Sequence, residues 1–251
     1  SGREGSNPYT HSWDEESGAV RRRPLEDARE LLAEAGYPGG MGPEGQQLTI
    51  EYTTVHSPGN AVYLEWLEKQ FNKLNIRLNI AETDYNRFRE KISTGNFQAF
   101  MWGWNADYPE PENFLFLLHG PNSKVKYQGE NAANYNNPQF NRLFERMKTM
   151  GNSPRRREII EKMVEIVRHD APWEFGFFPK SYALYHGWVS NVKPNKMANN
   201  TLKYMNIDRK RRNAYRAEHN KPKLGIVFGV LGAVLIIVLP GLIKAVRGEL
   251  S

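Results

Sequence analysis

The sequence contains no cysteine in its 251 residues. Disulfide frameworks, thiolate metal sites and cysteine nucleophiles are therefore excluded, although this absence does not fix the compartment. The six histidines are scattered, and neither an HExxH pattern nor another short ligand spacing occurs. The GxSxG turn of serine hydrolases and the phosphate-binding P-loop are missing as well. We therefore expect no enzyme, no metal site and no cofactor.

A basic excess is absent outside one short segment. The formal net charge is +6, and residues 209–223 hold seven lysines and arginines against Glu218 alone, which accounts for the whole excess. A basic run next to an apolar segment is more typical of anionic lipid headgroups or of an orientation signal than of nucleic-acid binding. We expect contacts with anionic lipid headgroups and no nucleic-acid partner.

Charge is also absent from residues 224–243, LGIVFGVLGAVLIIVLPGLI. As a helix rising 1.5 Å per residue, this run spans about 30 Å, the thickness of the hydrocarbon core of a bilayer. It predicts a single transmembrane helix, with Pro240 in its last turn, where weakened hydrogen bonding costs least. Gly225, Gly229 and Ala233 recur every four residues, so they form either a contact face for another helix or simply the small residues common in membrane spans.

The charges around this span give conflicting signals about its orientation. Seven basic residues precede the span, and only Lys244 and Arg247 follow it. The positive-inside rule would place the globular part in the cytoplasm, but the rule has little force for a domain that an upstream signal already exports. Both orientations stay open from the residues alone.

The body of the chain alternates helical and strand patterns. Amphipathic helices are expected from Pro24 to Gly36 and over residues 60–74 and 84–94, and alternating strands over residues 48–54, 76–82 and 97–102. Two further helices begin after cap residues that precede a proline, Asn137 and Ser153. The aromatic stretch 173–185 predicts strands, and Tyr127, Phe175, Phe177 and Phe178 are expected in the core. This order is typical of an α/β layer with at least partly parallel strands.

The domain boundaries follow from these patterns. We expect a loop-like lead-in over 1–23, an α/β lobe over 24–190 and an irregular return segment over 191–208. A basic juxtamembrane segment (209–223), the membrane helix (224–243) and a short tail (244–251) complete the chain.

The segment MWGWNADYPEPENF, residues 101–114, contains the most informative site residues. It follows a predicted strand, and ligands of open α/β sheets bind at the carboxyl ends of strands. Trp102 and Trp104 share a face if the strand continues, and Asp107 then lies beside an apolar surface. A carboxylate in such a place suits a cationic ammonium group. The alternative is an aspartate that accepts bonds from backbone amides in a proline-rich turn.

Four segments, in this order, resemble the family 5 extracellular solute-binding proteins, the peptide, oligopeptide and nickel receptors of ABC importers. They are EDARELLAEAGYPGG, GWNADYPEPENFLFLL, NYNNPQFNRLF and RRREIIEKMVEIVRHDAPWEFGFF, and the similarity covers about residues 20–205. The resemblance implies a periplasmic-binding-protein-like (class II) α/β fold, of which this chain carries the second lobe. The terminal transmembrane helix lies outside the common family pattern.

The resemblance also implies roles for individual residues. In peptide-binding members, the aspartate of the GWxxDYPxP-like loop pairs with the free amino terminus of the peptide, and by position this residue is Asp107. Trp104, Trp102 and Tyr108 are the expected pocket walls, and Asn134 and Tyr135 are further candidates for the lining. A single lobe can bury about half of a ligand, which is less than the roughly 70–90% typical of good pockets.

These observations lead to a membrane-anchored, extracytoplasmic receptor of the bacterial cell membrane. It would capture a peptide or a similar amine-bearing solute and deliver it to an ABC permease. The alternative is an accessory or structural subunit that uses a solute-binding lobe and docks on another integral membrane complex through its transmembrane helix.

Overall fold

The structure, a computed structural model, describes residues 6–195, 197, 200–221 and 224–249. The chain divides into two compact units, residues 1–178 and residues 179–251, and each is described by itself.

A parallel three-stranded sheet forms one layer of the first unit. Its strand order is β4 (Arg77–Thr83), β3 (Thr49–Val55), β5 (Ala99–Phe100). Helix α2 (Ala61–Asn72) connects β3 to β4, and α3 (Tyr85–Thr94) connects β4 to β5. This is the parallel α/β alternation that the sequence predicts, and it confirms the expected fold class.

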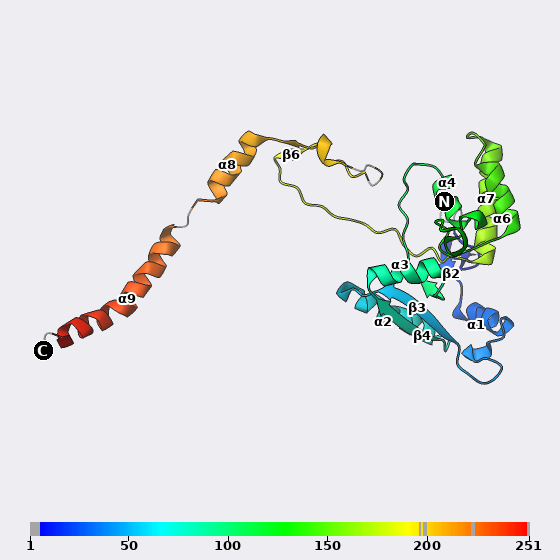
Figure 1. The fold of residues 1–251 in the computed structure, drawn as a ribbon, viewed down its shortest axis with the longest axis horizontal. Coiled ribbons are helices and arrows are strands. Elements are labelled where there is room, and N and C mark those ends of the chain that lie inside the picture. The colour runs from blue at the N-terminus through cyan, green and yellow to red at the C-terminus, as the bar shows by residue number, and fades with distance from the viewer. Residues whose placement is uncertain (1–5, 196, 198–199, 222–223, 250–251) are drawn as a thin grey trace. The chain divides into compact units, whose positions relative to one another are not determined.

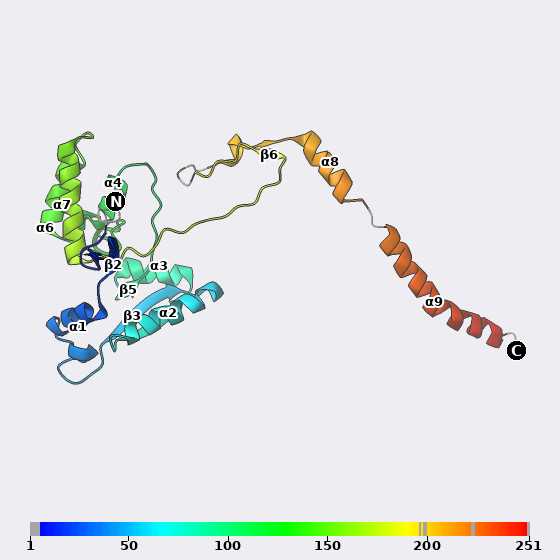
Figure 2. The same cartoon turned by 180° about the vertical axis from the view of Figure 1, so that it is seen from behind.

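The two connecting helices cover opposite faces of this sheet (Figures 1 and 2). Leu64 of α2 is buried with Tyr52 of β3 on one face. On the other face, Phe88 of α3 contacts Phe100 of β5 edge to face, with ring centroids 6.1 Å apart. Successive side chains of a strand point to opposite faces, so Ala99 packs toward α2 while its neighbour Phe100 packs toward α3.

A helical layer forms the second core of this unit. It consists of α4 (Glu112–Leu115), η3 (Phe116–Leu118), η4 (Gly120–Asn122), α5 (Lys124–Tyr127), α6 (Pro138–Met147) and α7 (Pro154–Asp170). Helices α6 and α7 lie side by side (Figures 1 and 2). Together with residues of α4 and η3, they bury an apolar cluster of Leu115, Leu118, Phe140, Phe144, Met147, Ile159, Met163 and Val167.

The predicted helix ends are confirmed by their caps. The side chain of Asn137 accepts from the backbone N–H of Gln139 and Phe140, and Ser153 caps α7 through the N–H of Arg156. Helix α1 (Leu25–Glu34) begins directly after Pro24, and α3 ends at Gly95, which has a φ of 78°. This left-handed conformation costs glycine little, because it has no Cβ.

The opening residues differ from the expected loop. A short antiparallel pair forms there, β1 (His11–Asp14) with β2 (Ala19–Arg22). The strands have only four residues each and are mostly polar, so their alternation gives little signal in the sequence. The short 3₁₀ turns η1 (Pro38–Gly40) and η2 (Pro58–Asn60) complete the unit.

Strand β5 is shorter than the six residues predicted. Its ladder with β3 covers only Ala99 and Phe100. One residue earlier, the side-chain oxygen of Gln98 accepts from the backbone N–H of Glu51 at 2.6 Å. A side chain thus takes the place of the backbone hydrogen bond that would precede this ladder, and the regular strand begins only at Ala99.

The strands predicted over residues 173–185 are absent, since the structure assigns no strand to any residue of this segment. The prediction that Phe175, Phe177, Phe178 and Tyr127 belong to the core is also wrong. Phe178 is 96% exposed, and Phe175, Phe177 and Tyr127 are each more than half exposed. A strand needs a partner for its backbone N–H and C=O groups, and the described residues supply none here.

The second unit contains a small antiparallel pair, β6 (Val189–Ser190) with β7 (Asn206–Ile207), the turn η5 (Leu202–Tyr204) and two helices. Helix α8 (Arg209–His219) is capped by Asp208, whose side chain accepts from the N–H of Arg211. The ring of Trp188 packs against this helix, 4.9 Å from the ring of Tyr215, centroid to centroid.

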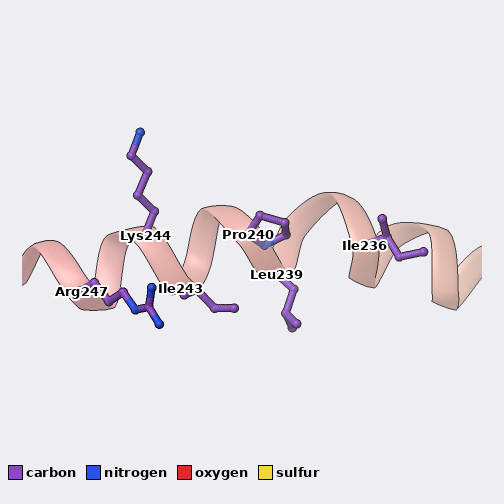
Figure 3. Close-up of a pocket in the computed structure, with 6 residues that line it drawn as sticks. All are labelled: Ile236, Leu239, Pro240, Ile243, Lys244 and Arg247. Carbon is purple, nitrogen blue, oxygen red and sulfur yellow. The ribbon is translucent and has the colours of Figure 1, made fainter.

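Helix α9 (Leu224–Glu249) contains the predicted apolar run but continues beyond it. It is long and apolar enough to cross a membrane by length and composition. The expectation that Pro240 lies in the last turn is wrong, because the ribbon continues on both sides of it (Figure 3). A proline inside a helix removes one N–H donor, and its ring crowds the carbonyl group four residues earlier, here that of Ile236. A hollow on the helix surface is lined by Pro240 and Ile236.

Candidate ligand-binding site

The loop that follows β5 leaves the sheet at its carboxyl edge. Because β3, β4 and β5 are parallel, their carboxyl ends meet at this edge, which is the usual binding edge of open α/β sheets. The loop runs from Met101 through Pro109 and Pro111 into the short helix α4. Every candidate site residue between Trp102 and Tyr108 therefore lies in a connection between the sheet and the helical layer.

Asn113, in α4, secures the centre of the loop. It is 2% exposed, and its Oδ1 accepts from the backbone N–H of Asp107 at 2.9 Å and from the indole Nε1–H of Trp104 at 3.2 Å. Its Nδ2 donates to Oδ2 of Asp107 at 3.2 Å. One buried amide thus holds both the aspartate and the tryptophan that the sequence selects.

The carboxylate of Asp107 is exposed at the surface. Among the described residues, the bond from Asn113 is the one hydrogen bond that its side chain makes. The turn alternative requires this carboxylate to accept from backbone amides, and no such bond occurs within the described chain. Most of its acceptor capacity therefore stays open to solvent or to a visiting donor.

The three aromatic candidates have different neighbours. Trp104 is half-buried and meets Phe116 edge to face, with centroids 5.6 Å apart. Trp102 is 43% exposed and lies 5.8 Å from the ring of Phe88. The prediction that Trp102 and Trp104 share a face required the strand to continue through both residues. The regular strand ends before either tryptophan, so that requirement is not met.

Tyr108 is exposed and directed along the loop. Its hydroxyl donates to Oε2 of Glu112 at 2.5 Å, and this bond raises the pKa of the tyrosine. The ring is therefore held next to Asp107 in the chain, with its hydroxyl occupied by a protein partner.

The far end of the loop is attached by an ion pair. Glu110 accepts from the guanidinium of Arg156, which is 5% exposed in α7, and this bond holds the pKa of Glu110 below its usual range. Arg156 also donates to the carbonyl of Met147 at 3.2 Å and to Oδ1 of Asn152 at 3.1 Å. The guanidinium thus joins the loop to both α6 and α7.

The other two candidates lie in a separate network. Asn134 adopts a φ of 54°, and its Oδ1 accepts from Oγ of Ser123 at 2.8 Å and from the N–H of Val125 at 3.0 Å. Tyr135 packs against the helical core and donates to Oδ2 of Asp170 at 2.5 Å, and burial raises its pKa. Both side chains support the helical layer, and within the described residues neither forms a hydrogen bond with the Asp107 loop.

Two hollows are found on the surface, and Asp107 lines neither. One lies at the carboxyl ends of β3 and β4, between His56, Ala61, Leu64 and Glu82, where His56 pairs with Glu82 at 3.2 Å. The other follows one face of α9 around Pro240 (Figure 3). The Asp107 side chain is exposed and borders neither of these hollows.

The helix-packing candidates Gly225, Gly229 and Ala233 are all exposed on α9. A Cβ added to Gly225 or Gly229 would have no other atom of the described residues within 4 Å, leaving aside the backbone of α9 and the immediate chain neighbours. Their face is open to a second helix.

Sequence reasoning missed Asn113 and Arg156. Arg156 had a detectable signal, since it occupies the apolar stripe of α7 three residues before Ile159, a position where a charge is unusual. Asn113 had no comparable signal, because its role depends on how the loop folds back over α4.

Comparisons with known proteins agree with this fold. The profile of the bacterial extracellular solute-binding proteins, family 5 (middle region), matches residues 2–125. Heme-binding protein A of Haemophilus influenzae is 28% identical over 161 residues, which are 62% of this chain and 28% of that protein. Di/tripeptide-binding protein 3 of Pseudomonas aeruginosa is 24% identical over 173 residues, 67% of this chain and 30% of that protein.

A solved structure gives the same result. The ABC transporter-associated periplasmic binding protein DppA of Helicobacter pylori, in complex with the peptide STSA, has a TM-score of 0.51 and 26% identity to this chain, covering 59% of this chain and 28% of that one. The chain thus spans less than a third of the length of these relatives. It has the mixed α/β architecture of periplasmic binding proteins, and its sequence is similar to the bacterial extracellular solute-binding proteins of family 5.

Proposed function

We propose that this chain is the carboxy-terminal part of the solute-binding component of an ABC importer, and that Asp107 binds the free ammonium group of a peptide or a similar solute. One observation carries the proposal. The Asp107 carboxylate is exposed at the carboxyl edge of a parallel sheet and held by a single side-chain bond, beside Trp104. A carboxylate with open acceptor sites forms strong charge-assisted hydrogen bonds with ammonium donors.

The relatives support a peptide as the first ligand to test. Several are named as dipeptide-, di/tripeptide- or oligopeptide-binding proteins, and one is named as heme-binding. Similarity to this family therefore supports solute binding, and the open carboxylate favours amine-bearing solutes.

Capture of a ligand at Asp107 needs a second wall. Two unit charges 4 Å apart attract by about 1 kcal/mol in bulk water and by about 4 kcal/mol at an effective dielectric constant of 20. Since the Asp107 side chain is exposed, another part of the protein must exclude water for the pair to approach the larger value. This chain spans less than a third of its relatives, so the proposal assigns that wall to the remainder of a full-length receptor.

We further propose that α9 anchors the receptor in the bacterial membrane, with the globular part extracytoplasmic. Its apolar run matches the bilayer thickness, and the exposed Arg209, Lys210, Arg211 and Arg216 of α8 precede it in the chain and suit anionic lipid headgroups. In this arrangement Gly225, Gly229 and Ala233 would face a helix of the permease.

The test is calorimetric titration of trialanine into the natural polypeptide that contains these residues, held in detergent. Asp107→Asn should weaken binding by about 10–150-fold, which corresponds to the roughly 1.5–3 kcal/mol of a hydrogen bond to a charged group. Glu161→Gln is the matched control, because it removes one negative charge from an exposed position on α7. Equal affinity of the Asp107→Asn variant and the unmodified protein would exclude the proposed role.

A further inference from the structure

The three hydrogen bonds of Asn113 converge on the two residues that the proposed recognition needs. Its Oδ1 bonds the N–H of Asp107 and the indole of Trp104, and its Nδ2 bonds the Asp107 carboxylate. These bonds span 2.9–3.2 Å and involve a side chain that is 2% exposed. A single buried amide thus fixes one backbone group and two side chains of the loop.

The chemistry of the neighbours determines which way this amide points. Two N–H donors lie against one end of the Asn113 side chain, and a carboxylate lies against the other. A reversed amide would direct its NH₂ group at two donors and its carbonyl oxygen at an anion. Only the observed orientation satisfies all three partners, so a carboxamide is the group that fits this position.

The position of Asn113 is itself fixed by the helical core and by the far end of the loop, which is attached to that core. Its backbone N–H donates to the carbonyl of Glu110 at 3.0 Å, and two residues later Leu115 enters the buried cluster. Glu110 is held in turn by the buried Arg156. The amide therefore stands on a rigid element, while the residues that it holds lie in a loop.

We infer that Asn113 is a positioning residue for ligand recognition, which directs the Asp107 carboxylate and the Trp104 ring toward the bound solute; this inference rests on the proposed function of Asp107. An aspartate on a loop loses side-chain freedom when a ligand orders it, and this loss weakens binding. Asn113 restrains the carboxylate before the ligand arrives, so the loss occurs during folding instead. Such support by a neighbouring hydrogen bond is what precise binding sites require.

A double-mutant cycle tests this coupling in the full natural polypeptide, with trialanine as the probe. Asn113→Leu keeps a similar volume and removes every hydrogen bond of the side chain. We expect it to weaken trialanine binding about tenfold in the unmodified protein and less than twofold in the Asp107→Asn background. An equal loss in both backgrounds would mean that Asn113 has only a structural role, and it would overturn the inference while leaving Asp107 as the ligand residue.

A measurement without ligand tests the restraint itself. In nuclear magnetic resonance, the Trp104 indole N–H should exchange slowly with solvent in the unmodified protein and fast in Asn113→Leu. Trp102 is the internal control, since its indole N–H has no hydrogen bond in the described residues and its ring is 43% exposed. Fast exchange of Trp104 in the unmodified protein would contradict the inference. Binding of trialanine that does not depend on Asp107 would instead remove the proposed function, and the inference with it.

Discussion

Two segments of this chain that contain aromatic residues, residues 101–113 and residues 173–185, have very different surroundings. In the first, Trp104 and Asp107 are bonded to the buried Asn113, and Glu110 is bonded to the buried Arg156. In the second, Phe178 is 96% exposed and Leu184 is 101% exposed. The difference shows that aromatic content alone does not bury a segment.

Buried polar partners distinguish the two segments. A buried donor or acceptor that loses its partner costs about 1–3 kcal/mol, so each such bond strongly favours one loop conformation. Residues 101–113 have several of these bonds, whereas no described strand or side-chain bond holds residues 179–185. We therefore call residues 101–113 the anchored segment and residues 174–185 the unanchored segment, because Trp173 still packs against the helical core.

The largest expected effect comes from matched phenylalanines. Phe140 is fully buried beneath the helices that hold the anchored segment, and Phe140→Ala should lower the free energy of unfolding by about 3–5 kcal/mol. Phe178→Ala, in the unanchored segment, should change it by no more than about 0.5 kcal/mol. Urea unfolding followed by tryptophan fluorescence measures both. A cost above about 1 kcal/mol for Phe178→Ala would mean that the unanchored segment is packed, and the comparison would fail.

The ion pair of the anchored segment should give the next largest effect. Arg156→Ala removes a buried guanidinium that bonds Glu110, Met147 and Asn152, and it should cost about 3 kcal/mol of unfolding free energy. Arg157→Ala, at the exposed neighbouring position, is the control and should cost no more than about 0.5 kcal/mol. Similar midpoints in urea for the two variants would show that Arg156 does not anchor the loop.

A smaller, pH-dependent effect should come from His119, which stacks on Phe144 in the same helical layer. Burial lowers the pKa of His119; Glu145, 3.2 Å away, opposes this shift and Lys148 reinforces it. The unfolded chain then binds the proton more tightly, so this contribution to stability is complete above the unfolded pKa and is lost as the pH falls through and below it. Stability should decrease from pH 7 to pH 5.

Two variants sharpen this test by moving the pH dependence in opposite directions. His119→Gln should make the decrease between pH 7 and pH 5 shallower. Glu145→Gln should make it steeper, because it removes the carboxylate that favours the protonated ring. Thermal unfolding across this pH range is the measurement, and parallel curves for both variants and the unmodified chain would contradict the assignment.

Much of the fold could be predicted because its signals are local. Caps such as Asn137, Ser153 and Gly95 depend on a few neighbouring residues, and the alternation of helices and strands predicts a parallel sheet with the Asp107 loop at its carboxyl edge. Where the sequence failed, the cause was a partner that local patterns cannot reveal. The side chain of Gln98 delays the start of β5 by bonding Glu51 of β3, a residue far away in the sequence.

The site could be predicted only in part, for the same reason. The position of Asp107 after a strand and the nearby tryptophans are sequence features, and the resemblance added the role. The support from Asn113 depends on a loop that folds back over α4. Asn134 and Tyr135 instead form hydrogen bonds with Ser123 and Asp170, in a separate network. Proximity in the sequence and polarity did not distinguish residues that support the fold from those offered to a ligand.

The most direct test of the central claim compares two ligands that differ only in the ammonium group. Trialanine and N-acetyl-trialanine share their shape beyond the first residue, but the acetylated form has no positively charged ammonium group to offer Asp107. Titration calorimetry on the unmodified natural polypeptide should give an affinity for trialanine at least about tenfold higher. Equal affinities for the two peptides would show that Asp107 does not bind a visiting positive charge.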